Sequence, residues 1–102
     1  MVVVVDIVNF LNKRIGTMNN HELKTINPHF KNLWCGAKKF EIRKNDRDFQ
    51  VGDIVTLREW DKDSYTERFM RCKITHILTH EDFPEGINEG YCVMSLRIFS
   101  QG

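Results

Sequence analysis

Five short runs of residues that favour β-strands follow one another along this chain, and turn residues bound each of them. The runs cover 21–26, 39–44, 54–60, 69–78 and 91–99. Between them lie Asn-Pro, Asn-Asp, Gly-Asp and Asp-Lys-Asp-Ser turn signals and a polar loop over 81–90. A chain of 102 residues has room for one hydrophobic core. The pattern therefore predicts one small, mostly antiparallel β-barrel of about five strands.

A helix is expected after the first of these strands. Asn27 can cap its first turn, Pro28 suits the first helical position, and Gly36 is a stop signal. Between them lies an apolar stripe at helical spacing, formed by Phe30, Leu33 and Trp34. We expect Phe30, Trp34 and Phe40 in the core. The predicted fold class is α+β, with the helix at one end of the barrel.

The first 17 residues read as an extension that precedes a domain over 18–102. Apolar residues recur at helical spacing over 3–15, and Gly16 would stop a helix there. The run of valines equally favours the start of a strand. Since an exposed apolar stripe needs covering, we expect this segment to pack on the barrel or to form a homodimer with a second chain.

Charge is distributed unevenly along the chain. Residues 1–47 hold nine Lys and Arg against four Asp and Glu, a balance of +5, and residues 48–102 hold six against ten, a balance of −4. The net charge is only +1. A protein that coats nucleic acid is usually basic throughout. A basic face on a near-neutral protein favours a local anionic site instead.

The cysteines and the apolar runs bear on compartment. Cys35, Cys72 and Cys92 form no CxxC pair, which argues against a disulfide framework and against a zinc knuckle and favours a reducing environment. The N-terminus lacks the basic start of a signal peptide. No stretch approaches the roughly 18 apolar residues of a membrane span. We therefore expect a cytoplasmic protein without a membrane segment, a metal or another cofactor.

The densest group of chemically capable residues lies between Gly36 and Arg47, where the predicted helix runs into a strand. Strand alternation puts Glu41 and Arg43 on one face, and Lys38 can reach the same space. Arginine suits phosphate or a base edge, lysine offers a point charge or an amine nucleophile, and glutamate can accept from an exocyclic amine or act as a general base. If Phe40 and Ile42 fill the core, Glu41 and Arg43 face a cleft or solvent. On composition alone, a solvated charged strand is the commoner arrangement.

The spacing Gly36-x-Lys38-x-x-Glu41-x-Arg43 resembles the GxKxxExR signature of ASCH domains, which are PUA-like barrels associated with RNA. The likeness extends over about residues 20–99, with further matching segments at 21–24, 40–54, 57–60 and 89–96. It points to an uncharacterised branch found in phages and in bacteria such as Firmicutes. The resemblance implies a PUA-like barrel with a cleft beside its helix.

Residue by residue, the resemblance implies a site made of Lys38, Glu41 and Arg43, with His21 and Lys24 as neighbours and Arg47 in the same basic run. One ASCH relative is an amidohydrolase that removes acyl groups from N4 of cytidine with this lysine, a threonine and a later glutamate. Here Glu41 stands at the threonine position. The candidates for the later glutamate are Glu81, Glu85 and Glu89.

Two other features carry weaker signals. His76 and His80 have the spacing of a helical metal pair, but residues 74–78 alternate like a strand, and in a strand residues four apart lie too far apart to share a metal easily. Trp60 ends a strand beside a polar loop and could stack a base, although packing at the barrel rim is the commoner role.

Three functions remain open at this point. The first is a module that binds RNA or a nucleotide-like ligand through the basic cleft, with Arg43 and its neighbours as binding residues. The second is a hydrolase of a modified nucleoside or of RNA, with Lys38 and Glu41 as catalytic residues. The third is a phage accessory protein that binds another protein. We place binding first because the threonine of the hydrolytic relative is absent.

Overall fold

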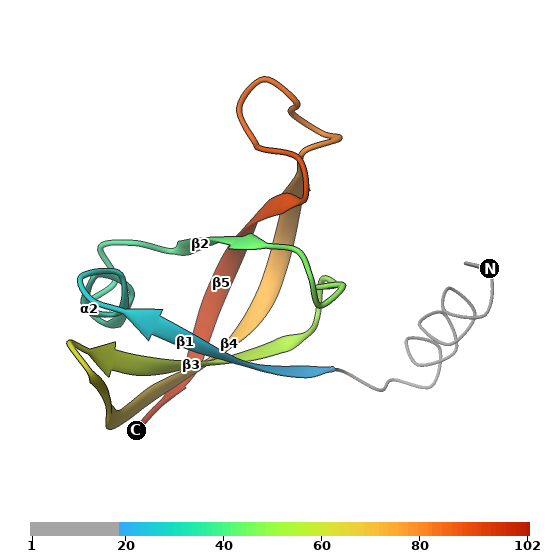
Figure 1. The fold of residues 1–102 in the computed structure, drawn as a ribbon. Helices are drawn as coiled ribbons and strands as arrows, with labels where there is room; N and C mark the ends of the chain where they lie inside the picture. Colours follow the sequence, from blue (N-terminus) through green and yellow to red (C-terminus); the bar gives the residue numbers. More distant parts are fainter. Residues whose placement is uncertain (1–18) are drawn as a thin grey trace.

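The computed structural model describes residues 19–102 and contains one short helix and five strands in that range (Figure 1). Their order is β1 (Asn20–Ile26), α2 (His29–Trp34), β2 (Phe40–Lys44), β3 (Ile54–Asp61), β4 (Ser64–Thr79) and β5 (Tyr91–Gln101). The helix predicted over 3–15 and its suggested part in a homodimer lie outside the described residues.

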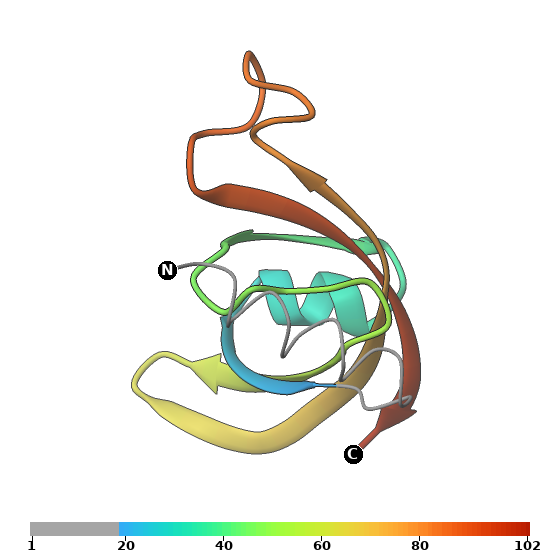
Figure 2. The same ribbon diagram turned by 90° about the vertical axis from the view of Figure 1, so that its right-hand side faces the viewer.

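The strands form a single curved sheet with the order β1-β3-β4-β5-β2. Strands β1 and β3 are parallel, and the other neighbours are antiparallel. The sheet curls into a half-barrel, and α2 sits at one of its ends, between β1 and β2 (Figures 1 and 2). The prediction of a small, mostly antiparallel, barrel-like fold with a helix after its first strand is confirmed at this level.

Curvature comes from irregular pairing along the longest strand. β4 is 16 residues long, and its pairing with β5 shifts register between Arg71 and Cys72 and again between Ile74 and His76. A register shift also interrupts β3 between Arg58 and Trp60. Extra residues of this kind bend a strand and increase its twist. They let β4 pair with β3 at one end and with β5 at the other.

The helix begins one residue later than its sequence signals predict. His29 is the first helical residue, and Pro28 takes the capping position. The Asn27 side chain still accepts a hydrogen bond from the Lys31 N–H at 3.1 Å, as a capping residue does. Gly36 follows the helix with φ +82°, a left-handed conformation that a glycine adopts without strain. This turn directs the chain towards Lys38 and β2.

The core lies between the concave face of the sheet and α2. Its fully buried side chains include Phe30, Leu33, Val55, Leu57, Met70, Cys72, Ile74, Cys92 and Met94. Burial raises the pKa of the Cys72 thiol to about 12, and the negative charge of Glu41 adds to this effect. Cys72 and Cys92 therefore serve as small apolar core residues. No helix within residues 19–102 is long and apolar enough to cross a membrane.

The expected orientation of β2 is wrong. Phe40 and Ile42 are 44% and 59% exposed, whereas Glu41 is 4% exposed and faces the interior. Successive side chains of a strand point to opposite faces, so the choice of which face is buried fixes the direction of every side chain in the strand. Here the charged face turns inward because Lys38 and Arg43 provide cationic partners for the Glu41 carboxylate there.

Candidate ligand-binding cleft

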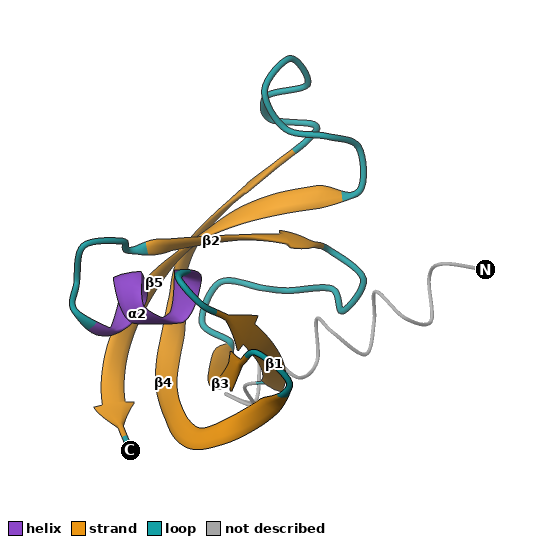
Figure 3. Cartoon of the chain, turned by 60° about the vertical axis from the view of Figure 1, so that its left-hand side comes forward, coloured by secondary structure: helices purple, strands orange, loops and turns teal. Residues whose placement is uncertain are grey.

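The two edge strands of the sheet, β1 and β2, face each other beside α2 (Figure 3). Residues of these elements line a pocket of about 510 Å³. Its lining comes from the end of β1, the first residue of α2 and the strand β2 with its approach. The lining residues are Lys24, Thr25, Ile26, His29, Lys38, Phe40, Glu41, Ile42 and Arg43. The pocket thus contains all three residues of the predicted central site.

The Glu41 carboxylate holds that site together. Lys38 Nζ donates to its Oε1 at 2.9 Å, and Arg43 Nε donates to its Oε2 at 2.8 Å. Lys38 and Arg43 retain partial exposure while Glu41 is buried. Two cations therefore share one anion, and the cluster keeps a net positive charge that faces the pocket.

Arg43 also reaches across from β2 to β1. Its Nη2 donates to the Lys24 carbonyl at 3.0 Å and to Thr25 Oγ1 at 2.9 Å. Arg47, in the loop after β2, donates from Nη1 to the Glu22 carbonyl at 2.9 Å. We call this gap between β1 and β2 the seam. Arginine side chains bridge it where a closed barrel would have a ladder of backbone hydrogen bonds.

The outer wall of the pocket is apolar. Phe40 and Ile42 stand on the exposed face of β2, and Ile26 is exposed at the end of β1. Lys38 Nζ lies 5.5 Å from the centre of the Phe40 ring. Exposed aromatic and aliphatic side chains beside a charged cluster are typical of a ligand site, where the apolar surface holds a ring and the polar groups orient it.

The sequence matches a family model over residues 20–96, which span every residue of the pocket and the seam. That family is described as a domain of unknown function, DUF3850. The chain belongs to the DUF3850 family.

An "Uncharacterized 12.9 kDa protein in GpA 3'region" of Escherichia phage P2 is 34% identical over 65 residues. The aligned part is 64% of this chain and 60% of the phage protein, so the match spans less than two thirds of that relative. The phage source of this relative agrees with the predicted phage or bacterial distribution.

Of the three predicted neighbours of the central site, one lines the pocket and two lie outside it. Lys24 lines the pocket, and its Nζ lies over the Trp60 ring, 4.2 Å from the ring centre. His21, at the start of β1, is outside the pocket lining. Its Nε2 lies 2.9 Å from Asp53 Oδ2, and its ring packs edge-on against Phe49. His21 thus joins β1 to the loop before β3, and Arg47 similarly lies on the seam outside the pocket.

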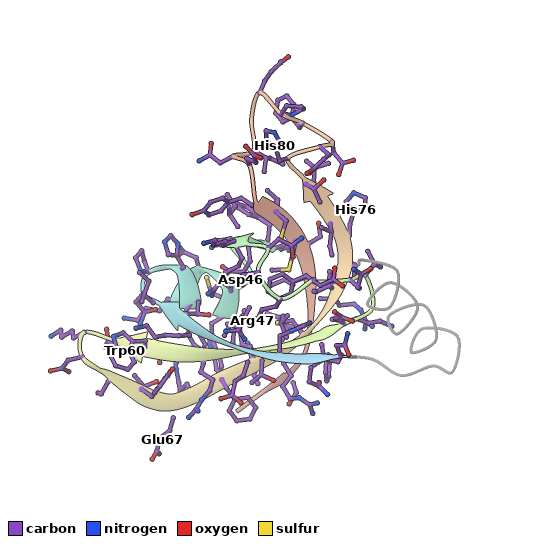
Figure 4. The ribbon with its side chains drawn as sticks, turned by 45° about the vertical axis from the view of Figure 1, so that its right-hand side comes forward. Asp46, Arg47, Trp60, Glu67, His76 and His80 are labelled. Atoms are coloured by element: carbon purple, nitrogen blue, oxygen red, sulfur yellow. The ribbon has the colours of Figure 1, made fainter. Side chains whose placement is uncertain are left out.

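The candidate residues in or near the loop over 80–90 are outside the pocket lining. This loop projects away from the sheet (Figures 1 and 2), and the candidate glutamates Glu81, Glu85 and Glu89 are exposed on it. His76 is exposed on β4, and His80 Nδ1 lies 2.6 Å from the Ile87 carbonyl oxygen (Figure 4). Within residues 19–102, no three His, Cys, Asp or Glu side chains gather as a metal site.

Sequence reasoning missed a second buried carboxylate, Glu59 on β3. It accepts hydrogen bonds from Asn27 Nδ2 at 2.7 Å, Thr66 Oγ1 at 2.6 Å and Arg68 Nε at 3.0 Å. Burial alone would raise the pKa of Glu59, but these hydrogen bonds and the charge of Arg68 lower it to about 2. The Arg68 guanidinium in turn lies 4.5 Å from the Trp34 ring.

Trp60 packs at the rim of the sheet, as its position beside the polar loop predicts. Its ring meets Tyr65 edge-on at 4.9 Å, and its indole N–H donates to the Lys62 carbonyl. With Lys24 over the same ring, these contacts occupy the Trp60 side chain. The exposed aromatic residue of the pocket is therefore Phe40, which the sequence pattern places in the core.

Proposed function

We propose that the DUF3850 domain binds RNA or a nucleotide, with one base held in the pocket between β1 and β2. The observation that carries the proposal is the pairing of the exposed Phe40 wall with the Lys38–Glu41–Arg43 cluster in one pocket of about 510 Å³. Pockets for small ligands typically span about 300–1,000 Å³. The pocket lies within this range and is large enough for a nucleotide.

The pocket offers each type of contact that a base requires. Phe40 presents a ring face on which any base can stack. A carboxylate has about four lone-pair positions, and Lys38 and Arg43 each donate to one oxygen of Glu41. The remaining positions can accept from an exocyclic amine of a base. The net positive charge of the cluster favours a ligand that carries phosphate.

The resemblance to ASCH domains supports the same proposal. We infer that this fold is a PUA-like barrel and that Lys38, Glu41 and Arg43 are the GxKxxExR residues of its cleft. Support comes from the contact of these three side chains with one another and from their place in the pocket lining.

Replacement of Phe40 tests the proposal without disturbing the seam. Phe40→Ala should weaken binding of a short single-stranded RNA roughly tenfold, because loss of base stacking costs about 1–3 kcal/mol. The measurement is fluorescence anisotropy with the full chain and a labelled hexaribonucleotide of mixed sequence. Phe40 is 44% exposed, so the variant should fold normally, which its circular dichroism spectrum and thermal unfolding would verify.

Phe83→Ala is the matched control. Phe83 is 49% exposed but lies in the loop over 80–90, outside the pocket lining. Its replacement should leave RNA affinity unchanged. Equal affinity of the wild-type protein and both variants, or failure of the wild-type protein to bind any RNA or nucleotide, would contradict the proposal. A protein partner captured by the same exposed Phe40 and Ile42 would then be the better account.

A hydrolase is the second candidate, and the contact between Lys38 Nζ and Glu41 Oε1 inside the pocket favours it. In that case Lys38 and Glu41 would share the transfer of a proton, and Arg43 would hold the substrate. The measurement is mass spectrometry of N4-acetylcytidine and of short RNAs after incubation with the protein. A product lost in Lys38→Ala would support an enzyme, and no product with any substrate would argue against one.

A further inference from the structure

A second, smaller pocket of about 230 Å³ adjoins the first on the side of β5. Lys38 lines both pockets and so marks where they meet. The other lining residues come from the end of α2, the segment after it and the middle of β5. They are Leu33, Gly36, Lys39, Leu96, Arg97 and Ile98.

The two pockets differ in charge. Three cations, Lys38, Lys39 and Arg97, line the second pocket, and its lining has no acid. Lys39 and Arg97 are exposed, and neither forms an ion pair with another side chain of residues 19–102. The first pocket, in contrast, has Glu41 between its cations. Lys39 and Arg97 therefore give the second pocket an uncompensated positive charge, while the charge of Lys38 is paired with Glu41.

The cations in the lining of the second pocket suit a phosphate anion. Leu33, Leu96 and Ile98 in the lining supply no polar side-chain atoms, so the cations supply all of its polar side-chain contacts. Gly36 is exposed, and a Cβ added there would meet nothing within 4 Å. Arginine and lysine donors around an open site are typical of phosphate binding.

We propose that this second pocket binds the phosphate of the nucleotide whose base occupies the first pocket. The inference rests on the proposed function and adds Lys39 and Arg97 to the binding residues. Lys38 stands at the junction of the two pockets, between base and phosphate. The ligand class is therefore a phosphorylated one, either a free nucleotide or a strand of RNA, and not an unphosphorylated nucleoside.

The test compares nucleosides with nucleotides on variants of the full chain. Isothermal titration calorimetry would measure binding of adenosine, cytidine, guanosine and uridine, each with and without a 5′-phosphate. For the best-bound base, Arg97→Ala and Lys39→Ala should each weaken the monophosphate about tenfold, since each removes a charge-assisted hydrogen bond. Neither should change the affinity of the nucleoside by more than about twofold.

Lys44→Ala is the control for overall charge. Lys44 is exposed at the other end of β2, outside both pocket linings, and its replacement removes the same single positive charge. It should leave both affinities unchanged. An equal loss in Lys44→Ala, or an unchanged monophosphate affinity in Arg97→Ala, would overturn the phosphate site while leaving the base site standing.

One further ligand distinguishes a site for an RNA strand from a site for a terminal phosphate. A dinucleoside monophosphate has only an internal phosphate. Arg97→Ala should weaken its binding if the site accepts a strand, and should leave its binding unchanged if the site accepts only a terminal phosphate. Either result supports a phosphate site when the 5′-monophosphate responds as expected. Absence of binding by every nucleoside, nucleotide and hexaribonucleotide would remove the proposed function and the phosphate site with it.

Discussion

At the scale of single residues, Glu41 has the largest structural role in the cleft. Its carboxylate is buried on the inner face of an edge strand, where only paired charges are tolerated. Lys38 and Arg43 supply that pairing, and Arg43 extends it to the backbone of β1. Glu41 thus positions the cations of the cleft and, through Arg43, also helps to hold β1 and β2 together at the seam.

Glu41→Gln should lower the free energy of unfolding by about 2 kcal/mol. A glutamine of similar volume leaves two cations without a counter-charge, and loss of one partner from a buried pair costs about 3–5 kcal/mol, a value that the partial exposure of Lys38 and Arg43 reduces. Urea unfolding followed by tryptophan fluorescence measures the difference.

Glu22→Gln is the matched control, since Glu22 pairs with Arg58 on the exposed surface at 3.0 Å. Exposed pairs contribute about 0–1 kcal/mol, so this variant should unfold close to the wild-type midpoint. Similar losses in the two variants would contradict the central role of Glu41.

At the scale of elements, the buried polar cluster around Glu59 fixes the helix to the β3–β4 hairpin. Asn27 belongs to the turn before α2, Glu59 to β3, and Thr66 and Arg68 to β4. Arg68 then stacks against Trp34 of the helix. Because α2 leads directly into Lys38 and β2, this cluster also positions one side of the cleft.

Stability should depend on pH through Glu59. Its pKa in the folded protein is about 2, below the ordinary 4.5, so the folded state favours the ionised carboxylate. Its contribution is complete above pH 4.5 and is lost as the pH falls through about 2. Urea unfolding of the wild-type protein and Glu59→Gln between pH 6 and pH 2 should show a stability difference that shrinks with falling pH. A difference that stays constant would argue against the hydrogen-bonded carboxylate.

At the scale of the whole molecule, the net charge of +1 limits how the protein can hold RNA. The proposed site would contact RNA through a few cations around two adjoining pockets. The nearly balanced numbers of basic and acidic residues do not provide a basic surface over the entire domain. Binding should therefore be local and only weakly sensitive to salt.

The logarithm of the RNA association constant should fall with the logarithm of salt concentration with a slope of about −1 to −2. Each neutralised phosphate of a single strand contributes about −0.7 to this slope, and the two pockets leave room for about two such contacts. Anisotropy titrations of the hexaribonucleotide at several concentrations of KCl measure it. A slope steeper than about −4 would indicate that RNA lies along a much larger basic surface.

Local signals were sufficient for the order of the elements. Turn residues and β-forming runs predicted the five strands within a few residues, and Gly36 marked the end of the helix because its left-handed φ is a local property. Strand β4 alone was clearly longer than predicted, since the pairs Trp60–Tyr65 and Asp61–Ser64 extend it into the hairpin. The short spacing from Lys38 to Arg43 likewise predicted that Lys38, Glu41 and Arg43 meet.

The tertiary structure decided which side of each element faces inward and which distant residues meet. Alternation along β2 defines two faces but cannot say which one is buried, so Phe40 and Glu41 exchanged their expected places. The contacts of Arg43 with β1, of His21 with Asp53 and of Asn27 with Glu59 join residues 18 to 32 positions apart. Such contacts depend on how the sheet curls, and a buried charge is stable only where that curl brings its partner within reach.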